Sequence, residues 1–282
     1  MSKLTLNSVL FNAAGIGMLV TTVVYAGYTY FVTPKIPRCT ARYAPQTQFD
    51  MSGEKGKLMT PIELQARGGT AEWGVLQNTE VVAGSAGAPE RILKVSLAST
   101  QNEDKLDQNG AGFVWNVDNI SNAPSSCLSY KVFIPGDFKF LEPGYLPGVF
   151  GTGPQAPEPE DGEEPKQAEG FEVRMAWATT GDVGVEIRSP KSQGTWLLPT
   201  RTTRWPLDRW VDVEQEVILN NPGAEDGVVR IWLDGSLVID APGVYYRGAP
   251  EATLSGVLAE IAYARTSSDP QTLQLSTFLL GW

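Results

Sequence analysis

Three basic side chains and one tyrosine are the residues whose types and spacing could bind an anionic ligand. Lys131, Arg174 and Arg188 each alternate with apolar neighbours, so each is expected on the strand face opposite the core. If these faces line one sheet, the three cations form a basic cleft with Tyr145 at its rim. Such a cleft would neutralise the carboxylates of an acidic substrate. The alternative is that they are ordinary basic residues on a solvated strand face, which is the more common situation.

The composition excludes several kinds of catalytic and metal site. The chain has 282 residues, a formal charge of −10, no histidine and 2 cysteines. No imidazole is available as a base or a ligand, and two cysteines are too few for a cysteine-rich zinc site. We therefore expect no metal and no cofactor. The negative charge also disfavours nucleic acid as a partner.

Cys39 and Cys127 leave two possibilities open. The simpler expectation is a pair of unlinked thiols. The alternative is one disulfide that pins the segment around Cys39 to the domain that contains Cys127, and such a bond requires an oxidising compartment.

Short strands separated by turn residues predict an all-β domain over residues 62–282. Apolar and polar residues alternate, as in half-buried strands, in three segments: 128–134, 171–177 and 211–219. Residues 228–233 and 237–240 flank Asp234-Gly235, a strong hairpin signal because both central residues of such a turn need positive φ. Helical periodicity is almost absent beyond residue 32, so we expect an antiparallel sandwich.

Several motifs occur in a fixed order along the chain. Residues 128–140 are followed by Gly144-Tyr-Leu-Pro-Gly148, and residues 210–235 contain an Asn-Pro-Gly turn and an Asp-Gly hairpin. With Arg174-Met-Ala-Trp177 and Tyr246-Arg247, these stretches resemble alginate-lyase-like proteins of polysaccharide lyase family 14. The resemblance covers roughly residues 92–282. It implies a β-jelly roll of two curved antiparallel sheets, whose concave face binds a uronic-acid polymer in the active relatives.

The resemblance also implies where catalytic groups would stand. β-Elimination from a uronate needs a cation or donor that neutralises the carboxylate and a base near the C5 proton. The family supplies a Lys before Leu-Pro-Gly, an Arg on the following strand, and a Tyr-x-Tyr pair before a proline. These positions fall on Tyr145, on Arg174, and on Glu186 and Arg188, so only the arginine is kept. If the chain is a lyase, the candidates are Arg174, Arg188, Lys131 and Tyr145. Five tryptophans could stack on sugar rings, although burial is their more common fate: Trp177, Trp196, Trp205, Trp210 and Trp232.

An uncharged apolar run at residues 9–32 predicts a single transmembrane helix after a short segment, 1–8. About 24 residues at a rise of about 1.5 Å each span the roughly 30 Å hydrocarbon core of a bilayer. A cleaved signal peptide is the alternative, but its apolar region would be roughly 7–15 residues long. Residues 33–61 are expected to form a proline-rich juxtamembrane stalk. Residues 151–170 are expected to form an acidic, proline-rich loop within the β domain.

Two functional hypotheses follow from these features. The favoured one is a membrane-anchored, non-catalytic accessory subunit: a lyase-like jelly roll fixed by its helix to a larger membrane complex, with respiratory and photosynthetic complexes as candidate hosts. The alternative is a membrane-tethered polysaccharide lyase or carbohydrate-binding module that acts on uronic-acid polymers. The expected partners are membrane subunits that contact residues 9–32 and the stalk, or an anionic polysaccharide under the second hypothesis.

The sidedness of the β domain receives opposite signals. Lys35, Arg38 and Arg42 outnumber the basic groups before the apolar run, and the positive-inside rule then favours a cytoplasmic domain. The family resemblance favours an extracytoplasmic (periplasmic) domain, which is our expectation.

Overall fold

The computed structural model describes residues 18–22, 36–68, 72–97, 110–152, 170–198, 202–264 and 270–282. The chain divides into two compact units, Met1–Pro37 and Arg38–Trp282. The expected transmembrane segment 9–32 lies outside the described residues, apart from a helical turn at residues 18–22. None of the described helices has the length and apolar character needed to cross a membrane. Of the expected acidic loop, residues 153–169 also lie outside the described part.

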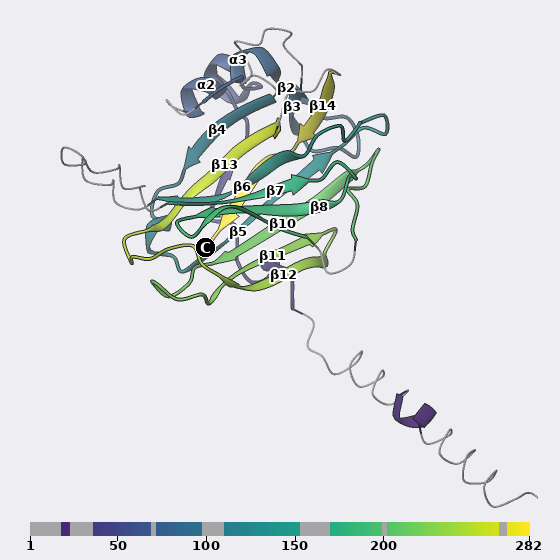
Figure 1. Ribbon diagram of the computed structural model, residues 1–282. Coiled ribbons are helices and arrows are strands. Elements are labelled where there is room, and N and C mark those ends of the chain that lie inside the picture. Colours follow the sequence, from purple (N-terminus) through teal and green to yellow (C-terminus); the bar gives the residue numbers. More distant parts are fainter. Residues whose placement is uncertain are drawn as a thin grey trace, which may run out of the picture. The chain divides into compact units, whose positions relative to one another are not determined.

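Two antiparallel sheets form a β-sandwich in the second unit (Figure 1). The nine-stranded sheet has the order β12-β11-β10-β5-β14-β3-β2, and β15 joins it by pairing with β5 and with β1. Its strands are β1 (Thr47–Phe49), β2 (Thr79–Ala83), β3 (Arg91–Leu97), β5 (Ser125–Phe133), β10 (Trp210–Ile218), β11 (Gly227–Leu233), β12 (Ser236–Val244), β14 (Gln271–Leu275) and β15 (Phe278–Gly281).

The six-stranded sheet has the order β4-β13-β6-β7-β8-β9. Its strands are β4 (Gly110–Asn116), β6 (Gly144–Thr152), β7 (Phe171–Trp177), β8 (Val183–Ser189), β9 (Ser192–Leu197) and β13 (Thr253–Tyr263). The expected antiparallel β-sandwich is therefore confirmed. The alternating segments become β5, β7 and β10, because their apolar residues face the space between the two sheets.

The hairpin expected around Asp234-Gly235 is also present, since β11 and β12 pair across it. Asp234 has φ of 47° and Gly235 has φ of 76°, as a tight hairpin turn requires.

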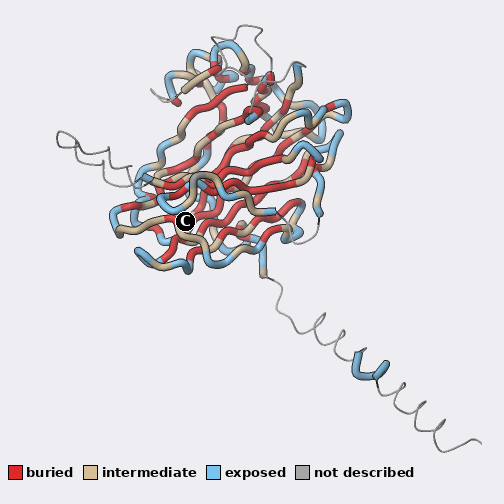
Figure 2. The backbone as a smooth tube through the Cα atoms, in the orientation of Figure 1, coloured by how far each residue is buried: buried red, intermediate tan, exposed pale blue. Residues whose placement is uncertain are grey.

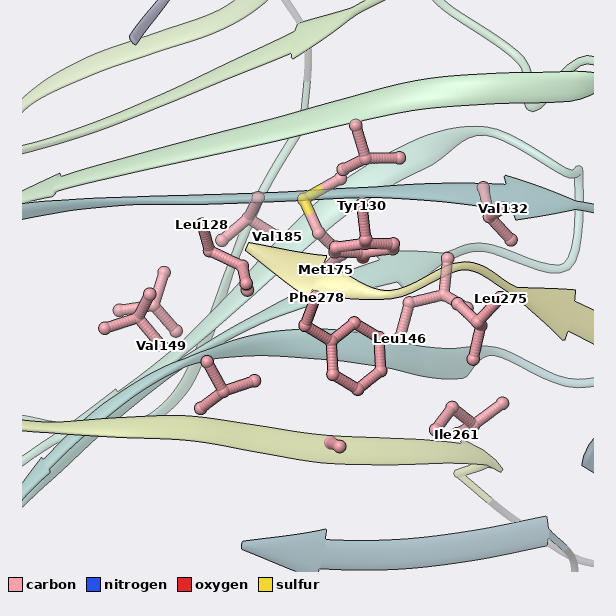
Figure 3. Packing of buried hydrophobic residues seen from close by; sticks show 14 of the residues in the cluster. Leu128, Tyr130, Val132, Leu146, Val149, Met175, Val185, Ile261, Leu275 and Phe278 are labelled. Atoms are coloured by element: carbon pink, nitrogen blue, oxygen red, sulfur yellow. The ribbon is translucent and has the colours of Figure 1, made fainter. Parts of the chain in front are cut away.

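The core lies between the two sheets, where the buried residues of their strands gather (Figure 2). Leu128, Tyr130 and Val132 of β5 face Leu146, Met175 and Val185 of the six-stranded sheet (Figure 3). One polar side chain crosses this apolar layer. Gln215 of β10 is fully buried, accepts a hydrogen bond from the Val149 amide at 2.9 Å, and donates one to the Val173 carbonyl at 3.0 Å. It thereby ties the two sheets together with both of its polar atoms paired.

Two short helices, α2 (Pro61–Gly68) and α3 (Val75–Asn78), depart from the all-β expectation. A capping box begins α2. The Glu63 amide donates to Thr60 Oγ1 at 3.2 Å, and Glu63 Oε2 accepts from the Thr60 amide at 2.7 Å. The signal Thr60-Pro61-Ile62-Glu63 is present in the sequence, but the helix is too short for its periodicity to be visible.

The second unit begins with a segment that lies on the outer face of the nine-stranded sheet. We call residues 38–43 the strap. Its Thr40 amide and Thr40 Oγ1 donate to Glu214 Oε2 at 3.0 and 2.9 Å, and its Arg42 pairs with Glu216 at 2.7 Å. Downstream of the strap, β1 pairs with β15. Residues 38–61 of the expected stalk thus belong to the folded unit.

A disulfide joins the strap to the sheet. Cys39 and Cys127 are bonded, with their Cα atoms 5.7 Å apart. The expectation of unlinked thiols is wrong, and the alternative of one bridge is correct. Two cysteines 88 residues apart in sequence meet because the strap lies beside β5, a proximity that sequence spacing alone cannot reveal.

Glu216 makes part of the stability pH-dependent. Burial alone would raise its pKa, but hydrogen bonds from Arg42, Arg230 and Tyr43 outweigh that effect and hold the pKa below its ordinary value. A carboxyl group whose pKa is lower in the folded state than in the unfolded state stabilises the fold when it is ionised. This stabilisation is complete above the pKa of the unfolded state, about 4.3, and is lost as the pH falls through the pKa of the folded state.

We expect a Glu216→Gln variant to lose about 2 kcal/mol of unfolding free energy at pH 7. The difference from wild type should shrink below about pH 4.3. Urea denaturation at a series of pH values measures this difference. The exposed Glu225→Gln is the matched control and should leave the pH profile unchanged. If Glu216→Gln lowers the unfolding free energy by the same amount at low pH, the carboxylate charge is not the cause of the loss.

Candidate functional site

Four sequence-predicted positions meet on the outer face of the six-stranded sheet. Tyr145 lies on β6, Arg174 on β7, and Glu186 and Arg188 on β8. The register places Arg174 directly opposite Glu186, while the intervening residues of these strands point into the core. Lys131 does not join them. It lies on β5 of the other sheet, where it forms an ion pair with Asp212.

Arg174 is the centre of the site, and its charge is already neutralised. Its side chain is 3% exposed and forms ion pairs with Glu186 and with Glu260 of β13. Glu172 contributes a third carboxylate at 3.8 Å. Burial alone would lower the pKa of Arg174, but the carboxylates of Glu260, Glu186 and Glu172 outweigh it and raise that pKa.

Gly148 lets Arg174 and β6 approach each other closely. It ends the Leu-Pro-Gly stretch, at an irregularity in the pairing of β6 with β7. A Cβ atom there would lie 1.8 Å from the Val173 carbonyl oxygen, so only glycine fits. The motif therefore has a structural role that is independent of the residue before it.

Tyr145 covers the guanidinium of Arg174. The Arg174 Cζ atom lies 4.0 Å from the centroid of the Tyr145 ring, within the range of a cation–π interaction. The Tyr145 hydroxyl donates to Glu186 Oε1 at 3.4 Å, a long hydrogen bond. Burial and the Glu186 carboxylate raise the pKa of Tyr145, and the nearby guanidiniums only partly offset this. At neutral pH the phenol therefore keeps its proton.

Two side chains at the edge of the site are accessible. Arg188 is 48% exposed, and its Nε lies 3.4 Å from Glu186 Oε2. Trp196 of β9 is half-buried, with its ring centroid 6.3 Å from that of Tyr145. The other four candidate tryptophans are core or surface residues away from this face: Trp177, Trp205, Trp210 and Trp232.

The charge balance of this face differs from the expected basic cleft. Three carboxylates, those of Glu172, Glu186 and Glu260, surround two guanidiniums, those of Arg174 and Arg188. Alternation within a strand identifies a face but not the acidic residues that share it, so the conditional cleft could not be decided from the sequence. Instead of a row of free cations, the face carries an ion-paired network.

A family model for polysaccharide lyase 14 matches residues 86–269, about two thirds of the chain. The chain belongs to the polysaccharide lyase 14 family. The resemblance in its motifs is therefore confirmed. No curated protein sequence matches the chain.

Solved structures of polysaccharide lyases share the fold of this family member at low sequence identity. The alginate lyase of Aplysia kurodai is 20% identical, with a TM-score of 0.59 over 74% of this chain and 88% of that one. An alginate lyase from a Chlorella virus is 15% identical, with a TM-score of 0.60 over 84% of this chain and 99% of that one. An endo-β-1,4-glucuronan lyase from Trichoderma reesei is 11% identical, with a TM-score of 0.54 over 84% of this chain and 95% of that one. At these identities the likeness establishes the fold alone.

Sequence reasoning missed two members of the network. Glu172 lies two residues before Arg174 on the same face of β7, a spacing that could have placed it there. Glu260 lies on β13 between Ala259 and Ile261, both buried, and this alternation marks it as outward-facing. Nothing local indicates that it reaches Arg174, which is 86 residues away in the sequence.

One group of described residues has donor atoms close enough together to hold a metal ion: Cys39, Cys127 and Glu214. The two sulfurs are bonded to each other, and Glu214 is bound by the strap, so this group offers no free ligand set. The carboxylates around Arg174 are likewise occupied by guanidiniums.

Proposed function

We propose that this chain is a non-catalytic member of its family. The observation that carries the proposal is the ion-paired state of Arg174, whose charge is balanced by Glu186 and Glu260. A uronate lyase needs a free positive charge or donor at the substrate carboxylate, because the carbanion formed on loss of the C5 proton is stabilised there. An arginine that is 3% exposed and already paired is poorly suited to this role.

The residues that stand at the family's lysine and tyrosine positions also lack an obvious base. Tyr145 stands where the family has a lysine, and its raised pKa works against deprotonation at neutral pH. Glu186 and Arg188 stand where the family has two tyrosines, and Glu186 is the residue that pairs with Arg174. The substitution at position 186 therefore both removes a phenol and adds the charge that occupies the remaining arginine.

Incubation of the full-length protein with alginate and with glucuronan tests this proposal. We expect no rise in the ultraviolet absorbance of the unsaturated product, while an active alginate lyase under the same conditions produces it. Product formation by the wild type that is lost in Tyr145→Phe would overturn the proposal and assign the activity to this face.

We further propose that residues 9–32 anchor the domain in a membrane and that the partners are other membrane subunits. The uncharged apolar run supports the anchor. The Cys39–Cys127 disulfide supports an extracytoplasmic, oxidising location for the domain. Alkaline carbonate extraction of native membranes should leave the chain in the pellet, with release only after residues 1–35 are deleted. Release of the intact chain by carbonate would contradict the anchor, and purification as a monomer without partners would contradict the accessory role.

A polysaccharide lyase or carbohydrate-binding module is the second candidate function. It is favoured by family membership and by the accessible Arg188 and Trp196 beside Tyr145. A cavity of about 380 Å³ lies next to this edge and is lined by Glu172, Arg188 and Phe150 among others. The absorbance assay above separates the lyase from the non-catalytic protein.

A further inference from the structure

The strap is held by two buried carboxylates of β10, Glu214 and Glu216. Glu214 is 1% exposed and accepts hydrogen bonds from Arg38 and from the amide and hydroxyl of Thr40. Glu216 is fully buried and accepts from Arg42 at 2.8 Å and from the Tyr43 hydroxyl at 3.0 Å. Every residue of the strap that donates a side-chain hydrogen bond to β10 thus binds one of these two glutamates.

The strap also covers an aromatic surface. Trp232 points outward from β11 yet is 1% exposed, and Arg42 lies over its ring at 5.9 Å. Arg230 of β11 approaches Glu216 from the opposite side at 3.1 Å. Removal of the strap would therefore expose the Trp232 ring, at a hydrophobic cost, and two carboxylates that water can solvate.

The disulfide closes the strap at one end. Cys39 is the second residue of the strap, and β1 fixes the chain just after its other end, through pairing with β15. With both ends held, residues 40–43 form a short closed loop that gains little conformational entropy by leaving the sheet. Once the bond is broken, the strap is held only by hydrogen bonds and by ion pairs whose basic partners are 44% and 32% exposed. Because these basic partners remain in contact with water, the pairs hold the strap less firmly than the covalent bond does.

We propose that the Cys39–Cys127 bond is a redox lock that fixes where the chain leaves the β-sandwich. While the bond is closed, the chain departs at Arg38. When a dithiol reductant opens it, residues 38–43 detach from β10 and the chain departs near Ala44. The preceding segment is thereby lengthened by roughly 20 Å, at about 3.3–3.6 Å for each of these residues.

The redox step balances without any group from the protein beyond the two cysteines. The thiolate of the dithiol attacks one sulfur of the disulfide, and the S–S bond breaks as a mixed disulfide forms. The second thiol of the reductant then attacks its own mixed-disulfide sulfur and releases the protein thiol. Overall, two electrons and two protons pass to Cys39 and Cys127, and the reductant becomes a cyclic disulfide.

Hydrogen exchange of the full-length protein in detergent, read by mass spectrometry, tests the lock. The Thr40 amide donates to Glu214 of β10 and reports opening of the strap directly, whereas the Arg42 and Tyr43 amides donate to the Cys39 carbonyl and report the turn within the strap. On reduction with dithiothreitol, we expect exchange in residues 38–43 to accelerate by at least about tenfold more than exchange in β7, which rises only with the loss of global stability. A Cys39→Ser variant should reproduce the reduced profile without reductant.

Each other outcome overturns the proposal. Unchanged exchange in the strap after complete reduction would mean that hydrogen bonds alone hold it. An equal rise in the strap and in β7 would show that the strap opens only together with the whole fold and that the bond is not a lock on one segment. A bond that dithiothreitol reduces only after unfolding would exclude a switch. With the disulfide intact, Glu214→Gln combined with Glu216→Gln should leave the strap closed, and opening in that variant would contradict the lock as well.

Discussion

Arg174→Met is expected to lower the unfolding free energy by about 3–5 kcal/mol. Methionine preserves the packing under Tyr145 but leaves Glu186 and Glu260 without the guanidinium that pairs with both. A buried carboxylate without its partner is far more costly than the pair is favourable. Urea denaturation followed by tryptophan fluorescence measures the loss.

Arg188→Met is the matched control for this prediction. Arg188 is 48% exposed and pairs with the same Glu186, so its loss should change stability by no more than about 0.5–1 kcal/mol. Equal effects of the two substitutions would show that Arg174 is not the residue on which the network depends.

Replacing both cysteines with serine is the second change with a large expected effect. The disulfide joins residues 88 apart in the sequence, and closing a loop of this size removes about 4–5 kcal/mol of conformational freedom from the unfolded chain. The Cys39→Ser, Cys127→Ser double variant should lose most of this amount in urea denaturation under oxidising conditions. Reduced wild type should match the double variant. A difference below about 1 kcal/mol would indicate that strap contacts persist in the unfolded state.

The strands and their inward faces were largely predictable from the sequence. Alternation in residues 128–134, 171–177 and 211–219 identifies half-buried strands because a strand reverses its face at every residue. The same rule places Arg174 and Arg188 outward. It cannot say which sheet a strand joins, and so Lys131 was grouped with residues from which the whole core separates it.

The chemistry of the site depends on contacts between distant segments. The register of β7 and β8 sets Arg174 opposite Glu186, and neither strand segment alone reveals that pairing. Arg174 on β7 can pair with Glu260 on β13 because only β6 lies between these two strands. That strand order is set when the whole sheet assembles. The disulfide was undecided for the same reason, since it depends on where residues 38–43 pack.

Glu186 and Glu260 neutralise Arg174, so we expect its charge to be unavailable to a uronate. Titration calorimetry of the full-length protein with an alginate tetrasaccharide at low ionic strength measures whether it is. We predict no saturable heat, because the face carries three carboxylates against two guanidiniums and would repel a polyanion. Saturable binding that weakens with salt, persists in Arg188→Gln and is lost in a folded Arg174→Met variant would contradict this expectation.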